Sequence, residues 1–303
     1  MTLTLRRGGT ALTAEWNGAE LFRYVYLPGD PQLESPRPYF HPVRTLSGDL
    51  VSLYRPHDHV WHKGIAFSLP NVGTENFWGG VTFRAGKYIQ VPNDGSMVHE
   101  TFETAAVADD VIRVGQRLSW VTETSGNTLV TERRRFAVDA WPDAGAWLLA
   151  FETSLANVSG DDIVIGSPTT EGRPNAGYGG LFWRGPRSFT GGTVLSPDGP
   201  GGDEMMGRRG PWLGLAGRHD GHGGWSSIVF RDGEENFCHP TRWFVRSTPY
   251  ACVCPAPFFD TEYAFKAGAT LRLRYDIAVA GGLLDTDGAA ALAARAAAHD
   301  LIG

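Results

Sequence analysis

The densest group of side chains that could transfer protons lies between residues 55 and 64. The segment reads Arg-Pro-His-Asp-His-Val-Trp-His-Lys-Gly and places imidazoles at His57, His59 and His62. Histidine titrates near neutral pH and is also the commonest metal ligand. The three side chains are therefore typical of two kinds of site, one for proton transfer and one for a metal ion.

A metal ion would use the His-x-His spacing of this segment. On an extended chain His57 and His59 point to the same side, so they could chelate a divalent ion, with His62 or a distant carboxylate completing the shell. No Glu-x-x-His pattern and no cysteine supports such a site. We therefore expect no metal and no other cofactor, with a divalent metal on these three histidines as the alternative.

Other polar and aromatic side chains flank the histidines. Asp58 could accept a ring N–H of a neighbouring histidine and select its tautomer, while Arg44, Trp61 and Trp78 would contact a ligand. In the alternative, Asp58 and the histidines form a hydrogen-bonded knot that only holds a loop. Four histidines and two arginines within 22 positions favour the functional interpretation.

A second cluster combines Glu171, Arg173, Tyr178 and Arg184 with four glycines, which let backbone approach a ligand closely. We expect Glu171 to be the acid or base that complements the histidines. Arg173 and Arg184 would then orient hydroxyl, keto or carboxylate oxygens. The alternative is a glycine-rich hairpin whose arginine and glutamate pair in solvent.

A third cluster contains His239, Arg242 and Trp243. Arginine and histidine donors beside tryptophan faces suit a polyhydroxylated ring. We expect all three clusters to converge on one concavity, because charges that were buried separately would be costly.

The composition is that of a globular protein, with 303 residues, 42% hydrophobic and 20% charged. A net charge of −6 and the absence of a Lys/Arg block argue against nucleic acid or an anionic membrane as partner. No segment is apolar for long enough to be a signal peptide or to span a bilayer, so we expect a cytoplasmic protein without membrane contact. The expected partner is a small carbohydrate-like molecule, and assembly into a homo-oligomer is left open.

Three common catalytic motifs are absent from the chain. It contains no G-x-S-x-G elbow, no G-x-x-x-x-G-K-[ST] loop and no G-x-G-x-x-G after a strand. The signals of serine hydrolases, P-loop enzymes and dinucleotide-binding enzymes are therefore missing.

Most of the elements that must position these clusters are predicted strands. Apolar and polar residues alternate over residues 271–279, and turn residues bound seven further candidates. These candidates are residues 21–27, 111–122, 129–138, 147–156, 163–166, 225–230 and 250–254. Hairpin turns are expected at Asn17-Gly18, Ser125-Gly126-Asn127 and Asp232-Gly233.

The alanine-rich run after Asp287 predicts one helix over about residues 287–301, with Asp287 as its N-cap. We expect this helix to pack on the outside. The fold class is all-β, an antiparallel two-sheet sandwich formed by residues 1–303 as a single domain.

Four motifs, PYFHPVRT, RPHDHVWHKG, NFWGG and YGGLFWR, carry a family resemblance. They resemble an uncharacterised bacterial family called PmoA-like, after a methane oxygenase. A methane monooxygenase membrane subunit needs transmembrane helices, and this sequence offers none, so the resemblance implies no such activity.

The chain also resembles galactose mutarotase-like proteins, which are β-supersandwiches that act on sugars. Trp61-His62-Lys63-Gly64 stands where those proteins carry a sugar-binding Leu-His-Gly-Gly segment, and Glu171 and Arg173 stand in place of their general-acid histidine. Cys254-Pro255-Ala256-Pro257 stands where they carry Cys-Leu-Glu-Pro, whose glutamate is the base. Without that glutamate, the resemblance implies the fold and a sugar-sized ligand more than mutarotation itself.

Together these patterns predict a carbohydrate-active enzyme that transfers protons on a sugar or keto-sugar-like molecule, as an isomerase, epimerase or lyase does. The alternative is a non-catalytic sugar-binding or sensing module, and the third interpretation is a histidine-dependent metal enzyme. Loss of the proton carrier would lower an enzyme's turnover by roughly a hundredfold or more but would weaken a binding module only modestly.

Overall fold

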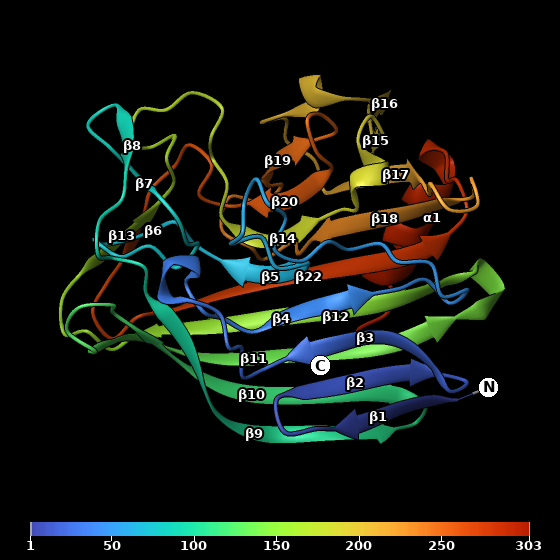
Figure 1. Ribbon diagram of the computed structural model, residues 1–303, viewed down its shortest axis with the longest axis horizontal. Coiled ribbons are helices and arrows are strands. Elements are labelled where there is room, and N and C mark those ends of the chain that lie inside the picture. Colours follow the sequence, from blue (N-terminus) through green and yellow to red (C-terminus); the bar gives the residue numbers. More distant parts are fainter. Residues whose placement is uncertain (1, 303) are drawn as a thin grey trace.

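The computed structural model describes residues 2–302, most of which belong to two large antiparallel sheets (Figure 1). The eight-stranded sheet has the order β1-β2-β3-β4-β5-β14-β20-β19. Its strands are Leu3–Arg7 (β1), Ala11–Trp16 (β2), Ala19–Val25 (β3), Tyr39–Val43 (β4), Ile65–Ser68 (β5), Gly180–Arg184 (β14), Cys252–Ala256 (β20) and Arg242–Arg246 (β19).

The nine-stranded sheet has the order β16-β15-β17-β18-β22-β12-β11-β10-β9. Its strands are Gly199–Gly201 (β16), Thr193–Ser196 (β15), Trp212–Arg218 (β17), Trp225–Asp232 (β18), Thr270–Gly281 (β22), Ala146–Asn157 (β12), Thr128–Trp141 (β11), Val111–Val121 (β10) and Ser96–Ala108 (β9).

Two small sheets lie beside the large ones. The first pairs β21 (Tyr263–Phe265), β13 (Ile163–Gly166) and β6 (Asn71–Val72), and the second is the hairpin of β7 (Thr82–Arg84) and β8 (Lys87–Ile89). The single α-helix of the described residues is α1 (Thr286–Ala297), and four short 3-10 helices are Gln32–Glu34 (η1), Pro142–Ala144 (η2), Arg187–Phe189 (η3) and Asp203–Met205 (η4).

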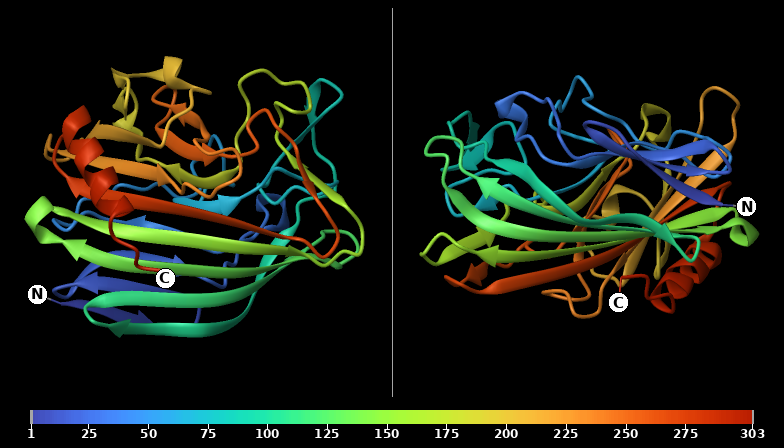
Figure 2. Two further views of the ribbon diagram at one scale, coloured as in Figure 1. Left: turned by 180° about the vertical axis from the view of Figure 1, so that it is seen from behind. Right: turned by 90° about the horizontal axis from the view of Figure 1, so that it is seen from below.

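The two large sheets face each other as separate layers across a continuous apolar core (Figure 2). Phe22 of β3 stacks on Trp147 of β12 with ring centroids 5.6 Å apart, so side chains from both layers interdigitate. On β10, alternate side chains such as Ile112 and Val114 are buried in this core. The structure confirms the predicted antiparallel two-sheet sandwich.

Helix α1 covers the outer face of the nine-stranded sheet (Figure 2). Its Leu292 and Ala293 pack with Leu148 and Ala278, which explains why β12 and the second half of β22 are buried on both faces. The helix begins after Asp285, whose carboxylate accepts a hydrogen bond from Gly288 N at 2.8 Å. The prediction of Asp287 as N-cap was therefore wrong by two residues.

Two of the three expected hairpin turns join neighbouring strands. Asn17-Gly18 joins β2 to β3 and Ser125-Gly126-Asn127 joins β10 to β11. The Asp232-Gly233 prediction was wrong, because the chain there leaves the nine-stranded sheet and continues into β19 of the other sheet. Within residues 2–302, no helix is long and apolar enough to cross a bilayer.

Candidate functional site

A cavity of about 420 Å³ lies on the face of the eight-stranded sheet that points away from the core. The pleat explains its composition, because Trp183, Trp243 and Val253 point into the core while their neighbours Phe182, Phe244 and Cys252 pack on the opposite face. The β7–β8 hairpin and the β13–β14 loop rise on the same side of the molecule as β19 and β20 (Figure 1). The hairpin contributes Tyr88 to the cavity lining, and the β13–β14 loop contributes Arg173 and Tyr178.

Six aromatic side chains line the cavity. They are Trp61, Trp78, Tyr88, Tyr178, Phe244 and Tyr250. Trp78 and Tyr178 lie with ring centroids 4.7 Å apart, and Tyr178 in turn contacts Phe244 at 5.5 Å. The polar side chains that complete the lining are His59, His62, Arg173 and Arg246.

Two consecutive turns present the histidines. His59 N donates to Pro56 O and His62 N donates to His59 O, each at 3.0 Å, and Arg55 N donates to His62 O at 2.9 Å. The segment is therefore not extended, and the expectation that His57 and His59 point to the same side was wrong. His57 instead contacts Arg187, while His59 lines the cavity.

A buried charge network beneath the turns holds the histidine segment in place. The Lys63 ammonium, fully buried, bonds the carboxylates of Glu34 and Asp30. Arg37, also buried, donates to the carbonyl of Trp61 at 2.6 Å and to that of Glu34 at 2.9 Å. These contacts anchor Trp61 and Lys63, at the C-terminal end of the His59–His62 turn, and the buried charge of Lys63 is paired.

The glycine pair of the NFWGG motif makes room for Trp61. Gly79 and Gly80 have positive φ of 97° and 74°, and a Cβ on Gly80 would lie 2.7 Å from the Trp61 ring. Only glycine tolerates both the backbone conformation and this close contact. Asn76 fixes the turn by accepting hydrogen bonds from Trp78 N and Gly79 N at 2.9 and 3.0 Å.

The rings of His59 and His62 stack within the cavity lining, 4.7 Å apart and 7° from parallel. Burial lowers the pKa of His59 below its ordinary value, although Asp58 opposes the shift. Burial also lowers the pKa of His62 well below its ordinary value, and the charges of His59 and Arg184 add to the effect. Both imidazoles are thus neutral near pH 7.

Arg184 forms hydrogen bonds with His62 and with Asp58, the residue next to His59. Its guanidinium, fully buried, donates to Nδ1 of His62 at 2.9 Å and to Asp58 at 2.9 and 3.2 Å, and lies 3.8 Å from the Tyr250 ring centroid. Burial alone would raise the pKa of Asp58, but the bonds and charge of Arg184 outweigh it and hold that pKa well below its ordinary value. Arg184 therefore positions other residues and does not line the cavity.

The partners of each ring select its tautomer. Since an arginine only donates, Nδ1 of His62 accepts and the neutral ring carries its hydrogen on Nε2. Asp58 Oδ2 lies 3.3 Å from Nδ1 of His59, in an ion-pair contact that lacks good hydrogen-bond geometry. The negative charge of Asp58 favours the tautomer of His59 that carries its hydrogen on Nδ1. In this tautomer Nε2 is a hydrogen-bond acceptor.

Two members of the predicted catalytic set do not line the cavity. The exposed His57 ring accepts from Arg187 at 2.9 Å, and Arg187 also bonds Asp58. Glu171 lies in a turn in which its N–H donates to Ser167 O, and its side chain is exposed. Asp58 and His57 thus form hydrogen bonds that hold the loop, as the alternative interpretation expected. His59 and His62 are the two histidines that line the cavity.

Besides Asp58 and Arg184, three predicted ligand-binding residues lie outside the lining. Arg44 bonds the carbonyl of Gly48 in its own turn. The ring of His239 contacts the buried carboxylate of Asp232 at 2.9 Å, and Arg242 pairs with Asp260 at 2.8 Å. The three clusters therefore converge only in part. Trp61, Trp78, Arg173 and Tyr178 line the same cavity as the two histidines, whereas His239 and Arg242 do not.

Sequence reasoning missed four aromatic or charged residues of the wall, which are Tyr88, Phe244, Arg246 and Tyr250. The period of two along β19 offered a signal for Arg246, because it places Phe244 and Arg246 on one face. Arg242 shares that face but lies about 13 Å further along the strand. Tyr88 belongs to a short hairpin without any pattern that predicts its position.

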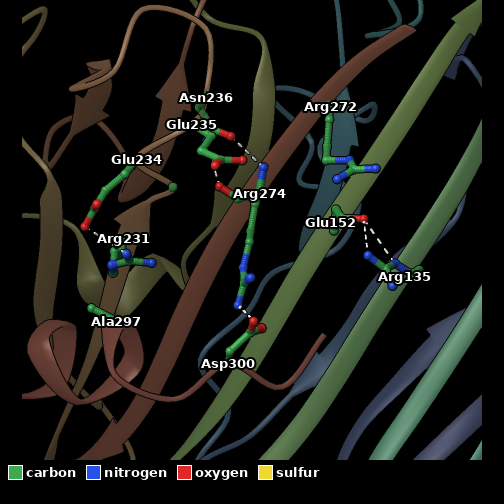
Figure 3. A pocket seen from close by; sticks show the side chains of 11 residues that line it. Arg135, Glu152, Arg231, Glu234, Glu235, Asn236, Arg272, Arg274, Ala297 and Asp300 are labelled. Atoms are coloured by element: carbon green, nitrogen blue, oxygen red, sulfur yellow. Dashed lines mark hydrogen bonds and ion pairs between the residues drawn. The ribbon is translucent and has the colours of Figure 1, made fainter. Parts of the chain in front are cut away.

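A second cavity, of about 380 Å³, lies on the outer face of the nine-stranded sheet near the end of α1 (Figure 3). Three of its four arginines are paired with acids across the surface. The pairs are Arg135 with Glu152, Arg231 with Glu234 and Arg274 with Asp300. It contains neither histidine nor aromatic side chains in its lining, so it offers no proton carrier near neutral pH.

The histidines of the metal alternative do not form a ligand set. Among the 301 described residues, 2–302, no three His, Cys, Asp or Glu side chains gather so that they could hold a metal ion. His57 turns toward Arg187, and Nδ1 of His62 is occupied by the hydrogen bond from Arg184.

The fold and the cavity together define an antiparallel β-sandwich protein with an aromatic, ligand-sized cavity on one sheet. The chain belongs to the family described as "Family of unknown function (DUF6807)", whose model matches residues 11–294. That family description does not carry the PmoA-like name that the motifs resemble. No curated protein matches the chain.

Solved structures of sugar-related proteins are similar to the chain at low identity. A GH36 α-galactosidase from Geobacillus stearothermophilus is 10% identical with a TM-score of 0.41, over 92% of this chain and 41% of that one. A galactose mutarotase related enzyme from Lactobacillus acidophilus is 10% identical with a TM-score of 0.39, over 93% of this chain and 99% of that one. The chain thus spans less than half of the α-galactosidase, and likeness at this level carries no argument about activity.

Proposed function

We propose that the protein is a carbohydrate-active enzyme that transfers protons on a sugar or keto-sugar-like molecule, as an isomerase, epimerase or lyase does. The observation that carries the proposal is the stacked pair of neutral imidazoles, His59 and His62, in a cavity walled by aromatic rings. A neutral imidazole is a competent base near pH 7, and a proton carrier works best when it lies within reach of a desolvated substrate.

The shape and chemistry of the wall suit a sugar ring. Indole and phenol faces such as those of Trp61, Trp78 and Tyr178 pack against the C–H faces of a pyranose or furanose. A volume of about 420 Å³ lies in the range of small-molecule sites and accommodates a monosaccharide with a substituent.

The opposite tautomers of the two histidines give them complementary roles. His59, with its hydrogen on Nδ1 beside Asp58, offers Nε2 as the base that removes a proton. His62, with its hydrogen on Nε2, acts as a donor to a substrate oxygen, and Arg184 prevents the ring from reversing this tautomer. The pair therefore combines one acceptor and one donor without a carboxylate.

Tyrosines complete the donor set. Burial raises the pKa of Tyr250, and burial together with Tyr88 raises that of Tyr178 well above its ordinary value. Both phenols thus remain protonated at physiological pH and would donate hydrogen bonds to substrate oxygens. The proposed chemistry needs no metal or cofactor, and metal analysis of the purified protein tests that point.

Hydrogen exchange into substrate carbon provides the direct test. A panel of aldoses, ketoses, keto-sugars and sugar acids would be incubated with the protein in D2O and followed by proton NMR. We expect deuterium incorporation, isomerisation or elimination with the wild type and its loss in His59→Ala. The matched control is His222→Ala, an exposed histidine that pairs with Asp49 outside the cavity.

The alternative function has a distinct outcome in the same experiment. A sugar-binding or sensing module would bind a panel member without exchange or turnover, and His59→Ala would then weaken binding only modestly. Absence of both turnover and binding across the panel would refute the carbohydrate proposal.

A further inference from the structure

Two arginines, Arg173 and Arg246, give the cavity positive charge, and no acidic side chain of the described residues 2–302 lines it. Across the same described residues, neither guanidinium forms an ion pair with a carboxylate. Because His59 and His62 are neutral near pH 7, the two arginines set the charge of the site.

This lack of acids is not a consequence of overall composition. The chain has 33 Asp and Glu against 27 Lys and Arg, and the second cavity pairs three of its four arginines with carboxylates (Figure 3). An excess of positive charge in a partly enclosed site of an acidic protein is the arrangement expected around an anionic ligand.

The structure holds Arg173 in place without using most of its donors. Its guanidinium lies 4.6 Å from the Tyr88 ring centroid, and its Nη1 donates to the Tyr88 hydroxyl. An aromatic partner and a neutral hydroxyl orient the group without cancelling its charge. The remaining N–H groups are available for a ligand.

Arg246 is positioned by the strand that bears it. It ends β19, directly beyond the buried Phe244 on the same face, and its guanidinium lies 5.6 Å from that ring centroid. The pleat directs it toward the cavity, and a fork of N–H donors suits the paired oxygens of a carboxylate or phosphate.

We propose that the ligand is an acidic sugar, whose carboxylate or phosphate oxygens bind Arg173 and Arg246 while its ring packs on the aromatic wall. This inference rests on the proposed sugar-binding function and names the substrate class. The shared chemistry is a singly or doubly charged oxyanion on a monosaccharide-sized molecule.

Calorimetric titration at low and high salt tests the inference. The probes are hexuronates and aldonates, hexose 6-phosphates, and the corresponding neutral hexoses. We expect an anionic probe to bind at least about tenfold more tightly than its neutral parent, and added NaCl to reduce the difference. Preference among the anionic probes distinguishes a carboxylate from a phosphate.

Three arginine variants locate the anion. Arg246→Gln and Arg173→Gln remove one charge each from the cavity and should abolish most of the preference for the anionic probe. Arg272→Gln removes the same charge from an exposed position in the second cavity and should retain it. Circular dichroism and melting temperature show whether each variant is folded.

The outcomes separate this inference from the proposed function. If a neutral hexose binds as tightly as its acidic counterpart, or if Arg272→Gln reduces the preference as much as Arg246→Gln, the acidic-sugar inference is overturned while the sugar site stands. If no neutral or acidic sugar binds, the proposed function is overturned and this inference with it.

Discussion

The imidazole of His59 lies 4.7 Å from that of His62 and almost parallel to it. Two adjacent imidazolium ions would repel each other in a partly desolvated cavity, so the pair can accept one proton far more readily than two. A pair of this kind is suited to the exchange of single protons, as the proposed function requires.

Removal of the His59 imidazole should abolish turnover without unfolding the protein. We expect His59→Ala to reduce the rate on a substrate by about a hundredfold or more, because a positioned proton carrier contributes that much. His57→Ala should remain within a few-fold of wild type, because that ring faces Arg187 and does not line the cavity. Equal losses in the two variants would contradict the assignment.

The pH dependence of the reaction should reflect the lowered pKa of His59. An ordinary imidazole is half protonated at pH 6.5, whereas burial lowers the pKa of His59 and keeps the ring mostly neutral at that pH. We expect the rate to fall to half of its plateau only below pH 6.5, as the base form is lost. A rate that has already halved at pH 6.5 or above would contradict this prediction.

The tautomers of the two histidines should be visible by nitrogen NMR. We expect the hydrogen on Nδ1 in His59 and on Nε2 in His62, because Asp58 and Arg184 contact the respective Nδ1 atoms. In Arg184→Met the His62 signal should change to a mixture of tautomers. Identical tautomers in the folded wild type would refute the complementary roles proposed above.

Loss of the buried Arg184 should destabilise the protein much more than loss of its exposed neighbour. Arg184→Met removes a fully buried partner of Asp58, and we expect the free energy of unfolding to fall near the lower end of about 3–5 kcal/mol, since Asp58 is 28% exposed. Arg187→Met breaks a half-exposed pair with the same carboxylate and should cost less than about 1 kcal/mol. Urea unfolding of both variants measures the difference.

Asp94 should make the stability depend on pH. Burial, together with the nearby Glu123 and Glu75, raises the pKa of Asp94 to about 7 from its ordinary 3.8. The folded state therefore retains a proton that the unfolded state releases, so stability is lost as the pH rises from about 4 to about 7. In Asp94→Asn, most of this loss, on the order of a few kcal/mol, should disappear.

Chemical unfolding at pH 4.5 and pH 7.5 measures that effect. Asp110→Asn is the matched control, since it changes an exposed carboxylate in the β9–β10 turn. A variant at position 94 that keeps the full pH dependence of the wild type would show that another group is responsible.

The true N-cap of the C-terminal helix can be identified by mutation. Asp285→Ala removes the carboxylate that accepts from Gly288 N and should lower the free energy of unfolding by about 0.5–2 kcal/mol. Asp287→Ala removes only a first-turn charge, worth about 0.3–1 kcal/mol. A larger loss of stability in Asp287→Ala than in Asp285→Ala would indicate that Asp287 is the N-cap, as the sequence pattern predicted.

Sequence patterns predicted the sandwich because alternation is a local consequence of a half-buried strand. Residues 271–279 alternate apolar and polar side chains and fall within β22, and the eight predicted strand segments all overlap observed strands. Asp232-Gly233 shows the limit of such signals, because a turn sequence does not reveal whether the next strand continues in the same sheet.

Sequence clusters predicted only part of the site. Residues 57–62 were recognisable from their chemistry, but their turn conformation depends on Arg37 and Lys63, which contact distant parts of the chain. Glu171 and Arg173 are two residues apart, yet only Arg173 enters the cavity. Chemistry alone could not separate them, since the direction of a loop side chain depends on what it packs against.

By itself, the sequence determined the fold class and the presence of one terminal helix, because strand alternation and helix capping are encoded within a few neighbouring residues. It also indicated the histidine-rich segment as a candidate site, and two of its histidines line the cavity. Only the tertiary structure decided that Arg246, Tyr250 and Tyr88 join His59 and His62, whereas His239 and Arg242 do not. Those relationships arise from the pairing of β19 with β20 and from the packing of loops over one sheet face, which no local pattern of residues encodes.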